Sequence, residues 1–197
     1  MKNIYKLFIL SLLFVGAVSC SDSDLPIDVL YDDVDTTASF IRTLDPPSSG
    51  PHSVSGGAFP NVIEAVIEIQ EGNGLAQPDF VEVRVYMSPF NDQDQIQPTL
   101  DENGNEIGET LLSTIPSSVF VPSEVNNLPS TDISIPLQEV ADLLPGAQFT
   151  VPTFIYIRME LEMTDGRVYT DTNVGPTVST GNYFIAPFFY NIIFLNI

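Results

Sequence analysis

Residues 153–163 have the sequence TFIYIRMELEM, and this stretch decides the fold class. Apolar side chains occupy every second position from Ile155 to Met163. The alternate positions carry Phe154, Tyr156, Arg158, Glu160 and Glu162. A period of two residues is typical of a β-strand with one face in the core and the other toward water. We therefore expect residues 153–163 to form a long strand.

The residues after this strand predict its partner. Asp165-Gly166 is a typical hairpin sequence, and Arg167–Thr170 follows it at once. Parallel strands need about a dozen residues to connect, so these two strands must pair antiparallel. A two-residue loop favours a type I′ turn, which requires positive φ at both Asp165 and Gly166.

The same alternation recurs in two segments nearer the N-terminus. Residues 62–70 and 80–87 each place four apolar side chains on one face, which we expect to be buried: Ile63, Ala65, Ile67 and Ile69 in the first, and Val81, Val83, Val85 and Met87 in the second. Further strands are expected at 38–44, 110–115 and 131–137, and an aromatic, apolar segment at 183–197 closes the chain.

Irregular segments separate these strands. Residues 45–51 are rich in Pro and Ser and should form a loop, and residues 91–108 form a polar excursion with Asn103-Gly104 at a hairpin tip. Residues 138–144 are the one helical segment we expect beyond residue 20, and Pro145-Gly146 ends it. Strands at regular spacing with one short helix predict an all-β sandwich.

The N-terminus has the features of a secretory signal. Lys2 and Lys6 precede an apolar run over 7–15, and small residues lead to Cys20. The run is too short to span a bilayer. Val18-Ser19-Cys20 resembles the bacterial lipobox, which implies cleavage before Cys20 and its lipidation. The alternative is an ordinary signal peptide followed by a chance or buried thiol.

This interpretation divides the chain into three parts. Residues 1–19 are the lipoprotein signal peptide, 20–35 an acidic tether and 36–197 the β-sandwich domain. Ser21, Asp22, Ser23 and Asp24 resemble the acidic export signal of surface lipoproteins in the Bacteroidota. A solvated tether is the alternative explanation of these four residues.

The charge of the mature chain limits its partners. Four arginines remain after residue 19 against 26 acidic residues, which gives a net charge of −22. Nucleic acid and anionic head groups would repel such a chain, because phosphate binding needs Lys and Arg. Cationic, metal-bridged or neutral partners remain.

Three segments of the second half carry a family resemblance: 133–144 (ISIPLQEVADLL), 163–169 (MTDGRVY), and 173–184 with Asn173-Val174-Gly175, Ser179-Thr180-Gly181 and Tyr183-Phe184. Together with the lipobox they resemble small immunoglobulin-like lipoproteins of the Bacteroidota, of the type of the SusE-like N-terminal domain. These occur beside SusC/SusD-type importers. The resemblance implies an immunoglobulin-like sandwich at the outer membrane, on the cell surface, and a non-catalytic accessory role in a nutrient uptake complex.

Two other functions are weighed against this role. The alternative is a free-standing carbohydrate-binding module on the cell surface, although the chain has no Trp for stacking on sugars. An enzyme is not expected. His52 is the one histidine, placed in a loop and expected at the surface, and Glu160, Glu162 and Asp165 are explained by solvent exposure.

Two further groups are weak site candidates. Asp92, Asp94, Asp101, Asn103 and Asn105 offer oxygen ligands to Ca²⁺, but Glu106 stands where an EF-hand needs glycine, so a polar hairpin is the alternative and no cofactor is expected. The aromatic residues near the C-terminus form either a partner face or, as we favour, part of the core: Tyr183, Phe184, Phe188, Phe189 and Tyr190.

Overall fold

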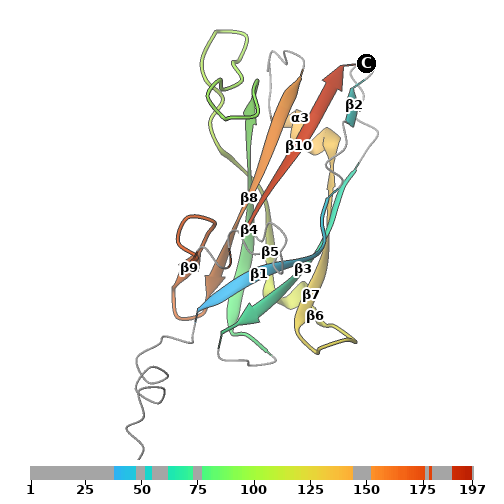
Figure 1. Cartoon of the computed structure of the whole chain (residues 1–197), viewed down its shortest axis with the longest axis vertical. Helices are drawn as coiled ribbons and strands as arrows, with labels where there is room; N and C mark the ends of the chain where they lie inside the picture. Colours follow the sequence, from blue (N-terminus) through green and yellow to red (C-terminus); the bar gives the residue numbers. More distant parts are fainter. Residues whose placement is uncertain are drawn as a thin grey trace, which may run out of the picture. The chain divides into compact units, whose positions relative to one another are not determined.

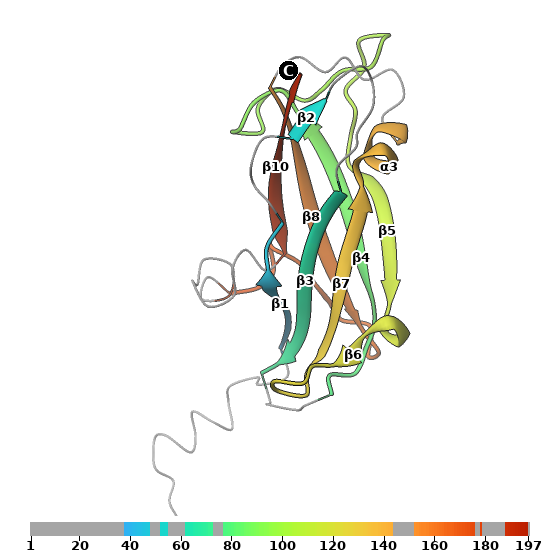
Figure 2. The same cartoon turned by 90° about the vertical axis from the view of Figure 1, so that its right-hand side faces the viewer.

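The computed structural model describes residues 38–47, 52–54, 62–72, 77–143, 152–175, 178 and 188–196. Their strands form two sheets that pack face to face (Figures 1 and 2). The expected all-β sandwich with one short helix is therefore confirmed. None of the described helices is long and apolar enough to cross a bilayer.

The smaller sheet has the strand order β1-β3-β7-β6, and every neighbouring pair is antiparallel. Its strands are β1 (Ser39–Asp45), β3 (Val62–Glu71), β7 (Pro129–Pro136) and β6 (Val121–Pro122). The 3₁₀ helix η1 (Ser117–Val119) precedes β6, and the helix α3 (Leu137–Asp142) follows β7 directly.

The larger sheet has the order β2-β10-β8-β4-β5, with the short β9 added to β8. Its strands are β2 (His52–Val54), β10 (Phe189–Asn196), β8 (Thr153–Met163), β4 (Phe80–Phe90), β5 (Thr110–Pro116) and β9 (Val168–Tyr169). All pairs are antiparallel except β2 with β10. The two strand orders correspond to the A-B-E-D and G-F-C-C′ sheets of immunoglobulin domains.

The core lies between the two sheets and is formed by the predicted alternating residues. On β3, all four apolar side chains predicted to be buried are buried, as are Ile155, Ile157, Met159, Leu161 and Met163 on β8. Burial of these aliphatic side chains supplies most of the folding free energy, at about 25 cal/mol per Å² of apolar surface.

One predicted core position is wrong. Val81 is 41% exposed, while its neighbour Phe80 is buried against Phe120, with the ring centroids 4.9 Å apart. The pairing of β4 with β8 shifts register between Phe80 and Glu82. A bulge there inserts one residue and reverses which side chains point inward. Val83, Val85 and Met87 follow the predicted alternation and are buried.

The predicted hairpin exists, but its turn type is wrong. The last paired residues before the turn are Met163 and Arg167, and the Gly166 N–H donates to the Met163 carbonyl at 3.0 Å. Gly166 has φ +86°, whereas Asp165 does not have positive φ. The loop therefore has three residues and ends on a left-handed glycine, which is the geometry of a G1 bulge. Asn103-Gly104 repeats it, with φ +82° at Gly104.

The remaining differences concern short or terminal elements. His52 begins β2, which pairs in parallel with Phe194, so its predicted loop assignment is wrong. The helix begins one residue earlier than expected and the described helical residues end at Asp142, while the C-terminal strand is confined to Phe189–Asn196.

Candidate functional site: a charged ladder on the larger sheet

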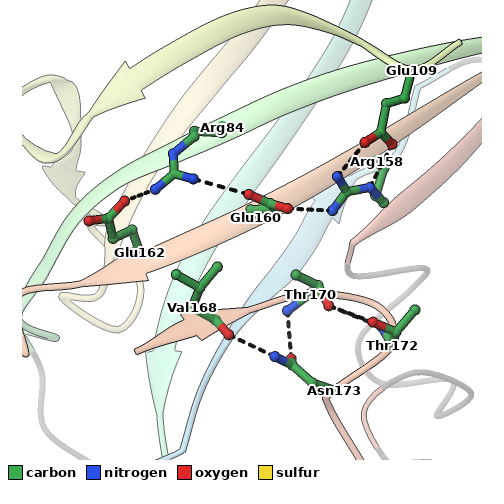
Figure 3. Close-up of polar contacts among 9 residues, drawn as sticks. All are labelled: Arg84, Glu109, Arg158, Glu160, Glu162, Val168, Thr170, Thr172 and Asn173. Carbon is green, nitrogen blue, oxygen red and sulfur yellow. Dashed lines mark hydrogen bonds and ion pairs between the residues drawn. The ribbon is translucent and has the colours of Figure 1, made fainter. Parts of the chain in front are cut away.

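The outer face of the larger sheet carries a ladder of alternating charges. The register of β4 with β8 sets Glu82 opposite Glu162, Arg84 opposite Glu160 and Tyr86 opposite Arg158. Because these are alternate positions of two strands and the residues between them are buried, they project from the outer face, as Figure 3 shows for Arg84, Arg158, Glu160 and Glu162. The site is thus a consequence of strand register.

At one end of the ladder, Arg84 contacts three carboxylates. Its Nε donates to Glu82 Oε1 at 2.9 Å and its Nη1 to Glu160 Oε2 at 3.2 Å, and it also pairs with Glu162. The hydrogen bonds with Glu82 and Tyr86 raise the pKa of Arg84. One guanidinium therefore holds three carboxylates that would otherwise repel one another across the strands.

Arg158 holds the other end. It makes a bidentate contact to Glu109, with Nε–Oε1 at 2.7 Å and Nη2–Oε2 at 2.6 Å, and its Nη1 donates to Glu160 at 2.8 Å. Its guanidinium carbon also lies 4.6 Å from the ring centre of Tyr86. The hydrogen bond with Glu109 is the main cause that raises the pKa of Arg158. Glu109 ends the loop between β4 and β5, so this contact ties that loop to the sheet.

The ladder ends in an aromatic group. Tyr156 contacts Phe90 edge to face and Phe189 in a tilted arrangement, with ring centroids 5.6 and 5.3 Å apart. The Tyr156 hydroxyl donates to the Gln93 carbonyl at 2.6 Å, and burial, followed by the charges of Asp92 and Asp94, raises its pKa. Tyr156 is buried beneath the loop, so its ring is not a platform open to a sugar.

The proposed Ca²⁺ ligands have structural partners in the same loop. Asp92 accepts backbone N–H groups from Asp94, Ile96 and Gln97. Desolvation raises the pKa of Asp92, but these backbone donors outweigh it and lower that pKa. Among the residues that the structure describes, no three His, Cys, Asp or Glu side chains are arranged to hold a metal ion.

The tip of the second hairpin is built in the same way. Asp101 accepts hydrogen bonds from the Asn105 side chain at 3.0 Å and from the backbone N–H groups of Asn103 and Asn105 at 2.8 Å each. The Asn105 side chain is the main cause that lowers the pKa of Asp101. Both carboxylates thus shape backbone turns.

The segment after β9 forms a turn that is held by hydrogen bonds among its own residues. The Asn173 side chain accepts the Thr170 N–H and donates to the Val168 carbonyl, both at 2.7 Å, and the Thr170 and Thr172 hydroxyls lie 2.9 Å apart (Figure 3). Before β9, Arg167 Nε donates to Asp165 Oδ2 at 2.7 Å. These side-chain hydrogen bonds therefore stabilise the turns on either side of β9.

The other predicted site residues are distributed as follows. Cys20, Ser21, Asp22, Ser23 and Asp24 lie outside the described residues, as do Tyr183 and Phe184. Phe188 is 1% exposed and Tyr190 6%, and both belong to the core, whereas Phe189 is half-buried on the outer face. Phe188 and Tyr190 therefore cannot contribute to an exposed partner face.

Sequence reasoning missed a second surface, on the outer face of the smaller sheet. Two adjoining depressions of about 440 and 410 Å³ share Val66 and Asp132. Strand register aligns Asp45, Val66 and Asp132 in one row across β1, β3 and β7. No sequence signal marks this site, because its residues come from three strands and become neighbours only through pairing.

The comparisons with known proteins do not identify a function for these surfaces. No protein-family model matches the chain, and no curated protein is similar to it. Function must therefore be argued from the geometry of this molecule.

Proposed function

We propose that the chain is a lipid-anchored, non-catalytic interaction subunit of the outer membrane, which acts in a SusC/SusD-type nutrient uptake complex. One observation carries the proposal. Exposed aliphatic side chains occur along the chain from β5 through η1 and β6 to the turn after β6: Leu111, Val119, Val121 and Val125. β5 and β6 lie at the same border of the sandwich (Figure 2). Val121 is 63% exposed and Val125 93%. Val119 and Val121 also line one depression together, and adjoining exposed apolar residues on so acidic a chain suit a contact surface.

The charged ladder supports a non-catalytic role. Its arginines contact carboxylate oxygens of Glu82, Glu109, Glu160 and Glu162, so an incoming substrate would have to break ion pairs before it met any of these groups. A general acid or base must instead be within hydrogen-bond reach of the proton that it moves. The ladder is better suited to holding the β4–β5 loop rigid next to the apolar border.

The experiment is affinity purification of the membrane-anchored protein after mild cross-linking, with mass spectrometry of what is retained. We expect an outer-membrane barrel protein to be retained together with the wild-type protein. A Val119→Ser/Val121→Ser variant should lose it, because the aliphatic contacts are removed. The matched control, Ile96→Ser/Leu100→Ser, changes two other exposed aliphatic side chains and should retain it.

Two results would contradict the proposal. One is retention of the barrel by the border variant at wild-type level. The other is a protein that purifies alone and whose melting temperature rises with a glycan, which would favour the carbohydrate-binding module.

A further inference from the structure

Three carboxylates of the smaller sheet, those of Asp45, Glu64 and Asp132, differ from those of the ladder because no described cation pairs with them. Among the described residues, Asp45, Glu64 and Asp132 make no hydrogen bond through their side chains and no ion pair. They line the second depression together with Val66. Acidic groups placed this close on one sheet face repel one another, so a cation that bound between them would be stabilised.

The residues that the structure describes leave no unpaired cation for these acids. Beyond Lys2 and Lys6 its basic residues are four arginines, and each is paired: Arg42 with Glu68, Arg84 with Glu82, Glu160 and Glu162, Arg158 with Glu109 and Glu160, and Arg167 with Asp165. The described residues therefore offer no cation to this face, and a positive charge from another molecule would fit it.

The edge next to these acids is open to a strand. β6 pairs with β7 only at Pro129 and Ser130. Phe120, directly before β6, packs against Phe80 in the core, so the chain does not follow the edge of β7 further. From Thr131 to Ser134, no described strand pairs with the outer edge of β7. An extended segment can add to such an edge through main-chain hydrogen bonds.

Apolar side chains complete the surface. Val119 and Val121 line the first depression beside Ser130, Thr131 and Asp132, and Val66 forms the floor shared by both depressions. An added strand would lie about 4.8 Å from β7 and present alternate side chains to this face. Aliphatic side chains would contact the valines, and basic ones would reach Asp132 and then Glu64.

We infer that β7 and this acidic, valine-lined face bind an extended segment of a partner protein in which every second residue faces the acids and valines, and in which these facing residues include both basic and aliphatic ones. The inference rests on the proposed function and specifies the chemistry of the partner. Opposite charges at the rim set orientation and association rate, while strand pairing and the valines hold the segment in place.

The test uses full-length protein in detergent and a labelled peptide of about ten residues with the repeat Lys-Ser-Val-Ser, which places Lys and Val on one face of the strand, capped at both ends. Fluorescence anisotropy measures Kd. We expect Asp45→Asn/Glu64→Gln/Asp132→Asn to raise Kd about tenfold, since each exposed ion pair contributes modestly. The control, Asp94→Asn/Glu102→Gln/Glu106→Gln, makes the same change in charge in the β4–β5 loop and should shift Kd less than about twofold. Thermal melting checks that both variants fold.

A second pair of peptides tests strand addition. Each peptide carries N-methyl groups on alternate residues. One peptide carries them on the odd-numbered residues and the other on the even-numbered ones, which defines the two registers. Because only one edge of the added strand donates to β7, one register should lose binding and the other retain it. The inference is overturned if both methylated peptides bind like the unmodified one, if both triple variants bind equally, or if the unmodified peptide does not bind.

The result of this test can be distinguished from the result of the test of the proposed function. A barrel that co-purifies with the wild type and the Asp45/Glu64/Asp132 variant alike, with no peptide binding, removes this inference and leaves the interaction subunit. Specific peptide binding by a protein that retains no barrel removes the uptake complex and leaves the basic partner.

Discussion

Glu68 is a carboxylate with no exposed surface, on the outer side of the smaller sheet. Three side chains cover it. Arg42 Nη1 lies 3.4 Å from Oε1, and the side-chain amides of Gln70 and Asn126 each donate at 2.6 Å. Sequence alternation assigned Glu68 to the solvent face, and could not show that the turn after β6 folds back over it. Such buried polar networks are costly when they are left incomplete.

We therefore expect Glu68→Ala to destabilise the protein by about 3 kcal/mol, because it removes the ion pair with Arg42 and leaves the side-chain amides of Gln70 and Asn126 without this acceptor. Glu64→Ala is the matched control on the same strand and face, since Glu64 is exposed and has no described partner. Urea midpoints measure both. Equal midpoints would mean that the network around Glu68 is not formed.

Tyr190 makes stability depend on alkaline pH. Its hydroxyl lies 2.8 Å from the Thr43 hydroxyl on the opposite sheet, and burial raises its pKa to about 12, partly offset by that hydrogen bond. The folded pKa lies above the unfolded value of about 10. The stabilisation is therefore complete below about pH 10 and is lost as pH rises toward 12.

From this we predict a loss of about 1.4 kcal/mol between about pH 9 and pH 11. Chemical denaturation at the two pH values measures it. In the Tyr190→Phe control the loss should shrink, because the titrating group is gone. A variant that keeps the full wild-type loss would assign it to other groups.

At the scale of elements, long strands were predictable and short ones were not. β3 and β8 each present a regular apolar face, which a period of two identifies within a single segment. β2 has three residues and β6 has two, so neither shows a period, and each exists because a neighbouring strand supplies its hydrogen bonds. The bulge in β4 is likewise fixed by pairing with β8.

The β8–β9 turn depends on one glycine. Gly166 has φ +86°, and a Cβ there would meet no atom within 4 Å, so the effect of a substitution comes from backbone strain alone. We expect Gly166→Val to destabilise the protein by about 1–3 kcal/mol. Gly175→Val, which also has open space and no positive φ, should have a much smaller effect. Denaturation midpoints compare the two, and equal values would contradict the G1 geometry.

The β4–β5 loop should depend on Asp92 in the same way. Removing its carboxylate in Asp92→Ala leaves the N–H groups of Ile96 and Gln97 without an acceptor. We expect faster hydrogen exchange at these two amides, with little change in global stability, since the loop is exposed. Asp94→Ala is the control, because the Asp94 carboxylate caps no described amide. Exchange that is unchanged in both variants would show that the Asp92 bonds do not order the loop.

At the scale of the whole molecule, charge is distributed unequally over the two sheets. On the larger sheet the acids of the ladder are paired with Arg84 and Arg158, whereas on the smaller one three acids face solvent beside an open edge. Composition predicted an acidic surface and a cationic or neutral partner. It could not locate the surface, because Asp45, Glu64 and Asp132 become neighbours only when three strands pair.

The attachment of the whole molecule is predicted to rest on Cys20, the one cysteine of the sequence. One acyl chain binds a membrane weakly, while two or more hold it stably, at about 0.8 kcal/mol per buried methylene. We therefore expect Cys20→Ala to move the protein from the membrane pellet to the supernatant. Its urea midpoint should not change, because residues 37–197 form a compact unit of their own. Ser21→Ala is the neighbouring control and should stay in the pellet. A Cys20→Ala protein that still sediments after a high-salt wash would be held by something other than lipid, since salt screens the charge contacts that remain.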